Sequence, residues 1–286
     1  HPDINNVHVV NLNRAKKKKS ASLLFKELRE LRKSGRYDLI IDMQGLIKSA
    51  IVSKLIPSKN TIGFDKNSSK EGFSSYFYSN SFEIDYGLNI ICRNANLVSG
   101  AMNFTVTNEE LKTKKSFLYP KNIYFEENIS LNKKNILLIP GASNSSKCYS
   151  VKKLAELTTL VDANFLIIWG NSIEKKMADK IKSMSPNVNI CEKLSIGYLV
   201  SLISQVNLVI GPDTGPTHMA WALNIPSITL FGSTPGYRNS FVTNINRIIE
   251  SDSTVNPYKI NRNDYSINNI KVTEICNLTK KILKTT

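Results

Sequence analysis

The chain has 286 residues, a formal net charge of +15 and a hydrophobic content of 41%. This length accommodates two domains, and the hydrophobic content supports a sizeable core and excludes a chain that is disordered throughout. No apolar run reaches the roughly 18 residues of a membrane span. The four cysteines show no CxxC spacing, which argues against a zinc site or a disulfide framework and favours small core residues in a reducing compartment.

The positive charge attracts polyanions, which include nucleic acids, anionic membrane surfaces and phosphorylated substrates. The sequence contains no aromatic-plus-basic RNA motif and no zinc finger. A nucleic-acid binder would therefore depend on charge alone, and we expect no nucleic-acid partner.

In the first half, apolar runs alternate with segments of helical periodicity. Residues 7–10 resemble a strand. The expected elements that follow are a helix over 20–34, a strand over 37–42, a helix over 46–55, a strand over 61–64 and a helix over 86–98. Residues 65–78 are polar and aromatic, and they are too long for a simple connection, which indicates a substrate loop or a surface excursion.

Residues 103–134 are charged and weakly periodic, so they indicate a domain end followed by a linker. We expect an N-terminal domain over 1–130 and a C-terminal domain over 131–286. The second half alternates again, with strands expected at 135–139, 165–169, 188–190, 208–210, 227–231 and 247–250, and with a final helix over 266–284. This alternation predicts an α/β fold of two doubly wound, Rossmann-like parallel sheets that face each other across a cleft.

The most informative stretch runs from Leu208 to Gly236, LVIGPDTGPTHMAWALNIPSITLFGSTPG. It predicts a strand, a polar turn, a short helix and a second strand. The turn stands at the carboxyl end of a strand and at a helix start, where unpaired N–H groups and the helix dipole favour phosphate. The alternative is an ordinary turn, in which Asp213 or Thr214 caps the helix and His218 is a hydrogen-bonded helix residue.

A second turn, GASNSSK, follows the strand that opens the second half. It is a weak phosphate-loop signal because it lacks the GK[ST] ending. It still places hydroxyl groups and the Lys147 cation at a strand end, where they suit a diphosphate. The alternative for Lys147 alone is an exposed lysine at a helix start. No GxGxxG follows a strand, which disfavours a dehydrogenase-type dinucleotide site.

Five motifs in this order resemble one family. They are YDLIIDMQGLIKSA, SSKEGFSSYFY, PGASNSSKCYS, WGNSIEKK and GPDTGPTHMAWAL. Together they resemble the lipopolysaccharide heptosyltransferases, more closely the type I than the type II enzymes. The resemblance implies the GT-B fold and inverting transfer of heptose from ADP-heptose to Kdo-lipid A, with no cofactor and no metal ion.

The resemblance also implies roles around the nucleotide. Asp213, Thr214 and Gly215 would hold the diphosphate, and His218 would lie beside it. Lys147 would neutralise charge on the departing ADP.

By the same resemblance, Ser143 would contact phosphate and Glu174 would accept hydrogen bonds from the ribose. Lys48 and Lys70 would face the anionic acceptor. On its own, Glu174 would be read as a surface glutamate at a helix start. The family activity implies a cytoplasmic protein in peripheral contact with the anionic face of the inner membrane.

One part of the family pattern has no counterpart in this sequence. The family's general-base aspartate follows its first N-domain strand in a glycine-containing turn, and we expect this base and its βα unit to be absent from the chain. Asp42 and Asp65 do not occupy the motif position. The alternatives are therefore a type II or related transferase with another acceptor, or an ADP-sugar-binding protein with impaired catalysis.

Overall fold

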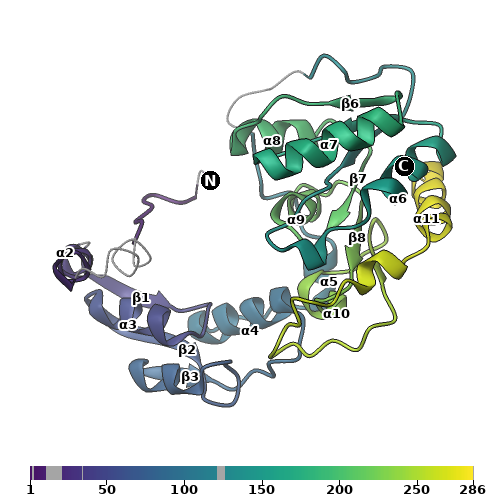
Figure 1. Cartoon of the computed structure of the whole chain (residues 1–286). Helices are drawn as coiled ribbons and strands as arrows, with labels where there is room; N and C mark the ends of the chain where they lie inside the picture. The colour runs from purple at the N-terminus through teal and green to yellow at the C-terminus, as the bar shows by residue number, and fades with distance from the viewer. Residues whose placement is uncertain (2, 11–20, 34, 121–125, 286) are drawn as a thin grey trace. The chain divides into compact units, whose positions relative to one another are not determined.

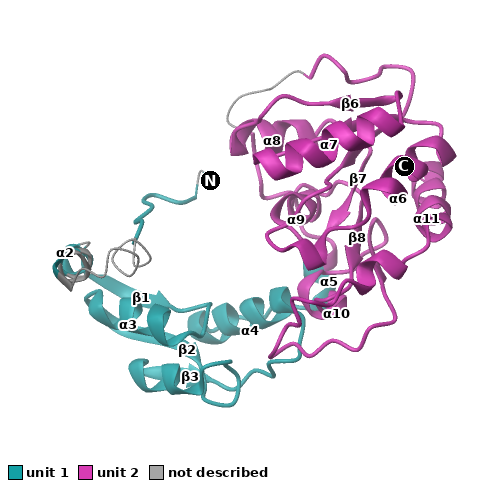
Figure 2. Ribbon diagram, viewed as in Figure 1, with its two compact units in different colours: residues 1–111 teal, residues 112–286 magenta. Residues whose placement is uncertain are grey.

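The computed structural model describes residues 1, 3–10, 21–33, 35–120 and 126–285 (Figure 1). The chain forms two compact units, residues 1–111 and 112–286 (Figure 2). This division lies earlier than the expected boundary between residues 130 and 131. The reason is that the segment after residue 112 packs on the second unit: Lys114 Nζ donates to the Trp221 carbonyl at 2.7 Å, and Phe117 N donates to the Ala222 carbonyl at 3.2 Å.

The first unit contains a parallel sheet with the strand order β1-β2-β3. Its elements are α2 (Ala21–Arg32), β1 (Tyr37–Ile41), α3 (Ile47–Leu55), β2 (Ser58–Phe64), the 3-10 helix η1 (Gly72–Phe77), β3 (Asn80–Phe82), α4 (Ile90–Met102) and α5 (Asn108–Lys112). Ile62, Phe64, Ile84 and Leu97 form its buried apolar cluster.

Two expectations for this unit are corrected. Residues 7–10 form no strand, because they pair with none of the described strands, and Val7 and Val9 remain 78% and 72% exposed. The short strand β3 and the short helix α5 were not expected, since neither is long enough to show a clear periodicity. Ser20 and Ser34, the expected ends of the first helix, lie outside the described residues.

The second unit contains a six-stranded parallel sheet. Its strands are β4 (Asn135–Leu138), β5 (Asn164–Ile167), β6 (Val188–Ile190), β7 (Leu208–Pro212), β8 (Ser227–Phe231) and β9 (Asn246–Glu250). Their order in space is β6-β5-β4-β7-β8-β9, which is the Rossmann order 3-2-1-4-5-6. The strand order reverses between β4 and β7, and ligands bind beyond the carboxyl ends of the strands at such a point.

Helices cover both faces of this sheet. They are α6 (Val151–Leu160), α7 (Ser172–Met184), α8 (Ile196–Ile203), α9 (Gly215–Ala222), α10 (Gly236–Asn239) and α11 (Val272–Thr285), with the 3-10 helices η2 (Ser145–Lys147) and η3 (Ser266–Asn269). The expected final helix over 266–284 is thus two elements, because the backbone of Ile270, with ψ at 128°, is not helical and separates η3 from α11.

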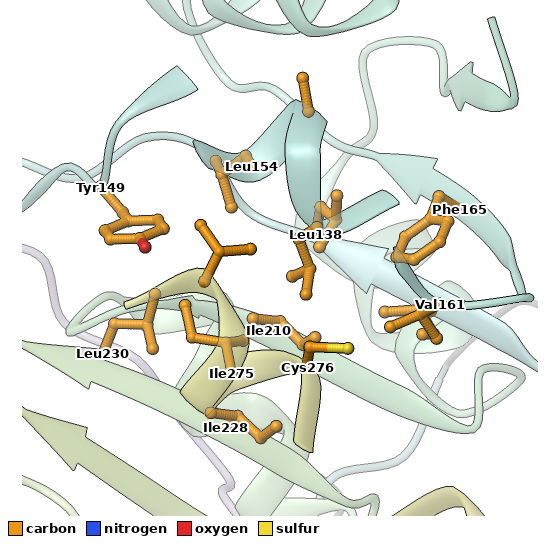
Figure 3. Packing of buried hydrophobic residues seen from close by; sticks show 14 of the residues in the cluster. Leu138, Tyr149, Leu154, Val161, Phe165, Ile210, Ile228, Leu230, Ile275 and Cys276 are labelled. Atoms are coloured by element: carbon orange, nitrogen blue, oxygen red, sulfur yellow. The ribbon is translucent and has the colours of Figure 1, made fainter. Parts of the chain in front are cut away.

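Alternate residues of each strand enter two separate cores, as the pleat of a buried strand requires. Ile136 and Leu138 of β4 pack in a cluster with residues of α6, α7 and α11. Figure 3 shows Leu138 in this cluster with Leu154 of α6 and Ile275 of α11. Leu137 and Ile139 pack in a second cluster with residues of α8 and α9. Both faces of the sheet are therefore covered by packed side chains, and this packing holds the turns at its carboxyl edge in place.

None of the helices in the described part of the chain combines the length and the apolar content needed to cross a bilayer.

The buried face of helix α11 offers a stability prediction. Thr279 is fully buried, and its hydroxyl oxygen has no hydrogen-bond partner. An unpaired buried hydroxyl costs about 1–3 kcal/mol, so Thr279→Val should raise the free energy of unfolding by about 1 kcal/mol. Urea unfolding measures this change.

Thr158→Val is the matched control, because the buried Thr158 hydroxyl donates to the Ala155 carbonyl at 2.6 Å and lies 2.7 Å from Ser185 Oγ, within hydrogen-bonding distance. This control should lower the free energy of unfolding. Equal losses of stability in the two variants would contradict the assignment of Thr279 as unpaired.

Candidate anion-binding site

The site is built at the carboxyl ends of β4 and β7, where the strand order reverses. Close packing here depends on Gly211 near the end of β7. A Cβ atom at this position would lie 2.7 Å from Ile139 Cβ and 3.0 Å from Thr217 Oγ1. Glycine therefore lets β7 approach the end of β4 and the first turn of α9. Thr217 Oγ1 fixes that turn by donating to the Pro212 carbonyl at 2.9 Å.

Three of the predicted residues meet directly in this place. Lys147 Nζ lies 2.7 Å from Asp213 Oδ2, and His218 Nε2 lies 2.9 Å from Asp213 Oδ1. Lys147 comes from the turn after β4, whereas Asp213 and His218 come from the turn after β7 and from α9. The predicted phosphate turn and the predicted helix start therefore form one cluster.

Asp213 is nearly buried, and its environment keeps it ionised. Burial alone would raise the pKa of its carboxyl group. Hydrogen bonds from His218 and Lys147, together with the charges of these side chains, hold this pKa well below its usual range instead. The cluster therefore presents a lysine cation fixed by a permanent counter-ion.

The amino end of α9 adds further polarity. Thr214 is its N-cap residue and receives no hydrogen bond from the first turn on its side chain, and Pro216 occupies the first turn. The space beside Gly215 is open, since a Cβ placed there meets no atom within 4 Å. This opening leaves room for an anion near the backbone N–H groups and the positive dipole end of α9.

Glu174 lies beside the turn that follows β4. Its Oε2 accepts a hydrogen bond from Gly170 N at 2.6 Å, and a Cβ on Gly141 would lie only 2.3 Å from Glu174 Cγ. Glycine at 141 therefore makes room for this glutamate against the turn. Ser143, in the same turn, is exposed.

The loop after β8 also belongs to the site, although no role was predicted for it. Thr234 Oγ1 and Asn239 Nδ2 donate to Asp213 Oδ2 at 3.0 and 3.2 Å, and Ser233 Oγ lies 3.1 Å from Ser146 Oγ. A signal was present, because the turn Gly232-Ser233-Thr234 places two hydroxyl groups at a strand end. These hydroxyl groups reach their partners only because the fold brings the turns after β4, β7 and β8 together.

Lys48 and Lys70 belong to the first unit, whereas the cluster belongs to the second. Both are exposed, and both adjoin the hydrogen bond that joins Ile47 N to Glu71 Oε2 at 2.8 Å. The two lysines therefore lie at the amino end of α3. Lys48 also lines a pocket of about 550 Å³ together with Met43 and Gln44.

Asp42 has a structural role. Its Oδ1 accepts from Gln44 N and Gly45 N at 2.9 and 3.4 Å, and its Oδ2 accepts from Ser49 Oγ and Tyr78 Oη, both at 2.7 Å. All four acceptor positions of the carboxylate are thus occupied.

A Rossmann-ordered sheet with a lysine cation and an open helix start at its switch point is the arrangement at which α/β proteins bind anionic ligands. Comparison with known proteins identifies the family. Residues 24–263 match the family model of glycosyltransferase family 9 (heptosyltransferase), and the chain belongs to this family.

Individual relatives agree with this assignment. The chain is 37% identical to lipopolysaccharide heptosyltransferase 1 of Campylobacter coli over 99% of this chain and 85% of the relative. The structure of E. coli heptosyltransferase WaaC with ADP matches with a TM-score of 0.77 at 18% identity, over 99% of this chain and 85% of WaaC. WaaC with ADP-2-deoxy-2-fluoro heptose gives a TM-score of 0.74 at 18% identity, over 98% and 84% of the two chains. The structural matches confirm the predicted GT-B fold of two Rossmann-like units.

Proposed function

We propose that this protein transfers heptose from ADP-heptose to a Kdo residue of Kdo-lipid A in the synthesis of the lipopolysaccharide inner core. Membership of glycosyltransferase family 9 and the likeness to a heptosyltransferase 1 support this proposal. The observation that carries it is the Lys147–Asp213 ion pair at the switch point of the sheet. At this position the Lys147 ammonium can bind the diphosphate of an ADP-sugar.

In this proposal the donor lies along the carboxyl edge of the second unit. Thr214 and Gly215, with the Asp213 turn, hold the diphosphate through backbone N–H groups and a hydroxyl. Ser143 and His218 flank it. Glu174 accepts hydrogen bonds from the ribose. The structure of WaaC with an ADP-heptose analogue supports an ADP-sugar as donor.

The reaction breaks the bond between the anomeric carbon and the diphosphate oxygen. ADP departs with the bonding electrons, and a hydroxyl oxygen of Kdo forms the new bond from the opposite face, which inverts the configuration. The hydroxyl proton passes to a carboxylate base. Lys147 and the dipole of α9 stabilise the negative charge that grows on ADP. The Asp42 carboxylate already accepts four hydrogen bonds within the first unit, which disfavours it as this base.

The acceptor side lies on the first unit. Lys48 and Lys70 supply positive charge for the phosphate and carboxylate groups of Kdo-lipid A. Beside them, Phe73 and Tyr76 of η1 are 61% and 75% exposed. Exposed aromatic rings next to lysines suit a membrane interface, so we place the protein in the cytoplasm, in peripheral contact with the anionic face of the inner membrane.

Flotation with phosphatidylglycerol vesicles tests the membrane contact. The wild-type protein should bind, and Phe73→Ser/Tyr76→Ser should weaken binding at unchanged thermal stability. Equal binding to neutral phosphatidylcholine vesicles would contradict a role for anionic lipid.

A transfer assay tests the function itself. The full-length protein should release ADP from ADP-heptose only when Kdo-lipid A is present, and the lipid should gain the mass of one heptose. Release of ADP without an acceptor, or transfer only to a lipid that already carries heptose, would refute the proposal. The second outcome would indicate a type II enzyme.

The ribose contact yields a separate prediction. Glu174→Gln keeps an acceptor for Gly170 N but removes the charge, and hydrogen bonds to charged groups contribute about 1.5–3 kcal/mol. We expect the Kd for ADP to rise about tenfold, as measured by titration calorimetry. Glu156→Gln, an exposed position on α6, is the control and should leave the Kd unchanged. An unchanged Kd in Glu174→Gln would remove this residue from the nucleotide site.

A further inference from the structure

The Asp213 carboxylate is held by more than its two charged partners. Thr234 and Asn239, from the loop after β8 and from α10, both donate to the oxygen that also pairs with Lys147. We propose that Thr234 and Asn239 are positioning residues: they fix the Asp213 carboxylate so that it aims the Lys147 ammonium at the leaving diphosphate. This inference rests on the proposed function and adds residues that act through Asp213.

The hydrogen bonds leave the carboxylate little freedom. Asp213 Oδ2 accepts from Lys147 Nζ, Thr234 Oγ1 and Asn239 Nδ2 at 2.7, 3.0 and 3.2 Å, while Oδ1 lies 2.9 Å from His218 Nε2. Four side chains therefore hold this one carboxylate, three of them at Oδ2. Rotation of the group would break several bonds at once, because the donors come from different segments of the chain.

The segment that supplies two of these donors is itself anchored. Gly236 N donates to Glu250 Oε1 of β9 at 2.8 Å, and a Cβ at Gly236 would lie 2.7 Å from that oxygen. Thr234 and Ser233 are 2% and 1% exposed. The short helix α10 is therefore anchored to β9. Such rigid support keeps a functional group in its productive geometry.

Lys147 needs this support because its stem is long and flexible. Its side chain is 19% exposed, so it reaches the surface of the site while Asp213 behind it stays at 9%. Loss of one donor would let the carboxylate turn and the ammonium move with it. Stabilisation of the departing ADP would fall most, because the leaving-group charge is largest in the transition state.

The test uses Thr234→Val, which keeps the shape of the side chain and removes its donor. We expect kcat to fall about tenfold, with the Kd for ADP changed less than threefold and the melting temperature close to that of the wild type. Thr234→Ser restores a hydroxyl group and should recover most of the lost kcat. Thr279→Val, a buried threonine whose hydroxyl has no partner, is the matched control.

A double-mutant cycle adds a measurement that a purely structural role would not produce. In a Lys147→Met background, Thr234→Val should have no further effect on kcat, because the residue acts only through Lys147. Asn239→Ala, which removes the second donor, should behave in the same way. Additive effects in the cycle, or full activity of Thr234→Val, would overturn the inference.

Failure of the proposed function can be distinguished from failure of the positioning role. A wild-type protein that neither binds ADP nor transfers heptose refutes the function. A wild-type protein that does both, with the cycle additive, refutes only the positioning role. If Thr234→Val unfolds, Asn239→Ala and Thr234→Ser still decide the question, because the first deletes a donor and the second keeps one.

Discussion

Lys147→Met should lower kcat for heptose transfer about a hundredfold, which is the scale of losing one electrostatic stabiliser. The methionine keeps the length of the side chain and removes the charge that Asp213 holds at 2.7 Å. Because the charge on the leaving ADP is greater in the transition state than in the bound donor, the KM for ADP-heptose should change less than kcat. Steady-state kinetics over a range of donor concentrations measure both quantities.

Lys180→Met controls for the loss of one positive charge, since Lys180 is exposed on α7. This control should match the wild type. If Lys147→Met kept its kcat and raised only KM, Lys147 would contribute to donor binding and not to the chemical step.

Asp213→Asn should lower the free energy of unfolding by about 3 kcal/mol at pH 7, because removal of one member of a buried ion pair leaves its partner uncompensated. The same change should lower kcat/KM more than tenfold, since Lys147 loses the group that fixes it. Urea unfolding and transfer kinetics measure the two effects. Asp179→Asn, which breaks an exposed pair with Lys175, should have little effect on either quantity.

The difference in the free energy of unfolding between the wild type and Asp213→Asn should become smaller at acidic pH. Hydrogen bonds from His218 and Lys147, and their charges, outweigh burial and hold the pKa of Asp213 well below its value of about 4 in an unfolded chain. The contribution of this carboxylate to stability is therefore complete above about pH 4 and is lost as the pH falls further. The gap between the wild type and Asp213→Asn should narrow as the pH falls below about pH 4. A gap that did not narrow below pH 4 would contradict the assignment.

The regular elements of the second unit were predictable because they depend on local patterns. The buried strands β4, β5 and β7 are continuous apolar runs that end in glycine or proline turns, and α7 shows an apolar face at helical spacing. Such signals depend on neighbours in the sequence. Short elements such as β3 and α10 lack them, because their few residues are held by tertiary contacts.

The residues of the site likewise fall into two groups, those that could be predicted from the sequence and those that could not. Asp213, His218 and Lys147 could be named from the sequence because two polar turns each follow a strand of a parallel sheet, and a family resemblance strengthened the choice. Thr234 and Asn239 could not, since serine, threonine and asparagine are common turn residues and nothing local reveals their partner. Asp42 was considered from the sequence as a carboxylate candidate, but in the fold its carboxylate accepts four hydrogen bonds and has a structural role.

By itself, the sequence determined the α/β class, the family and the turns that bear charge, because each of these follows from residue types at short spacing. Only the tertiary structure decided the strand order that places the turns after β4, β7 and β8 together, and the pairing of Lys147 with Asp213 that results. The physical reason is that these contacts join Asp213 to Lys147, 66 positions earlier, and to Asn239, 26 positions later. Packing of the whole sheet, and not any local propensity, brings them within hydrogen-bonding distance.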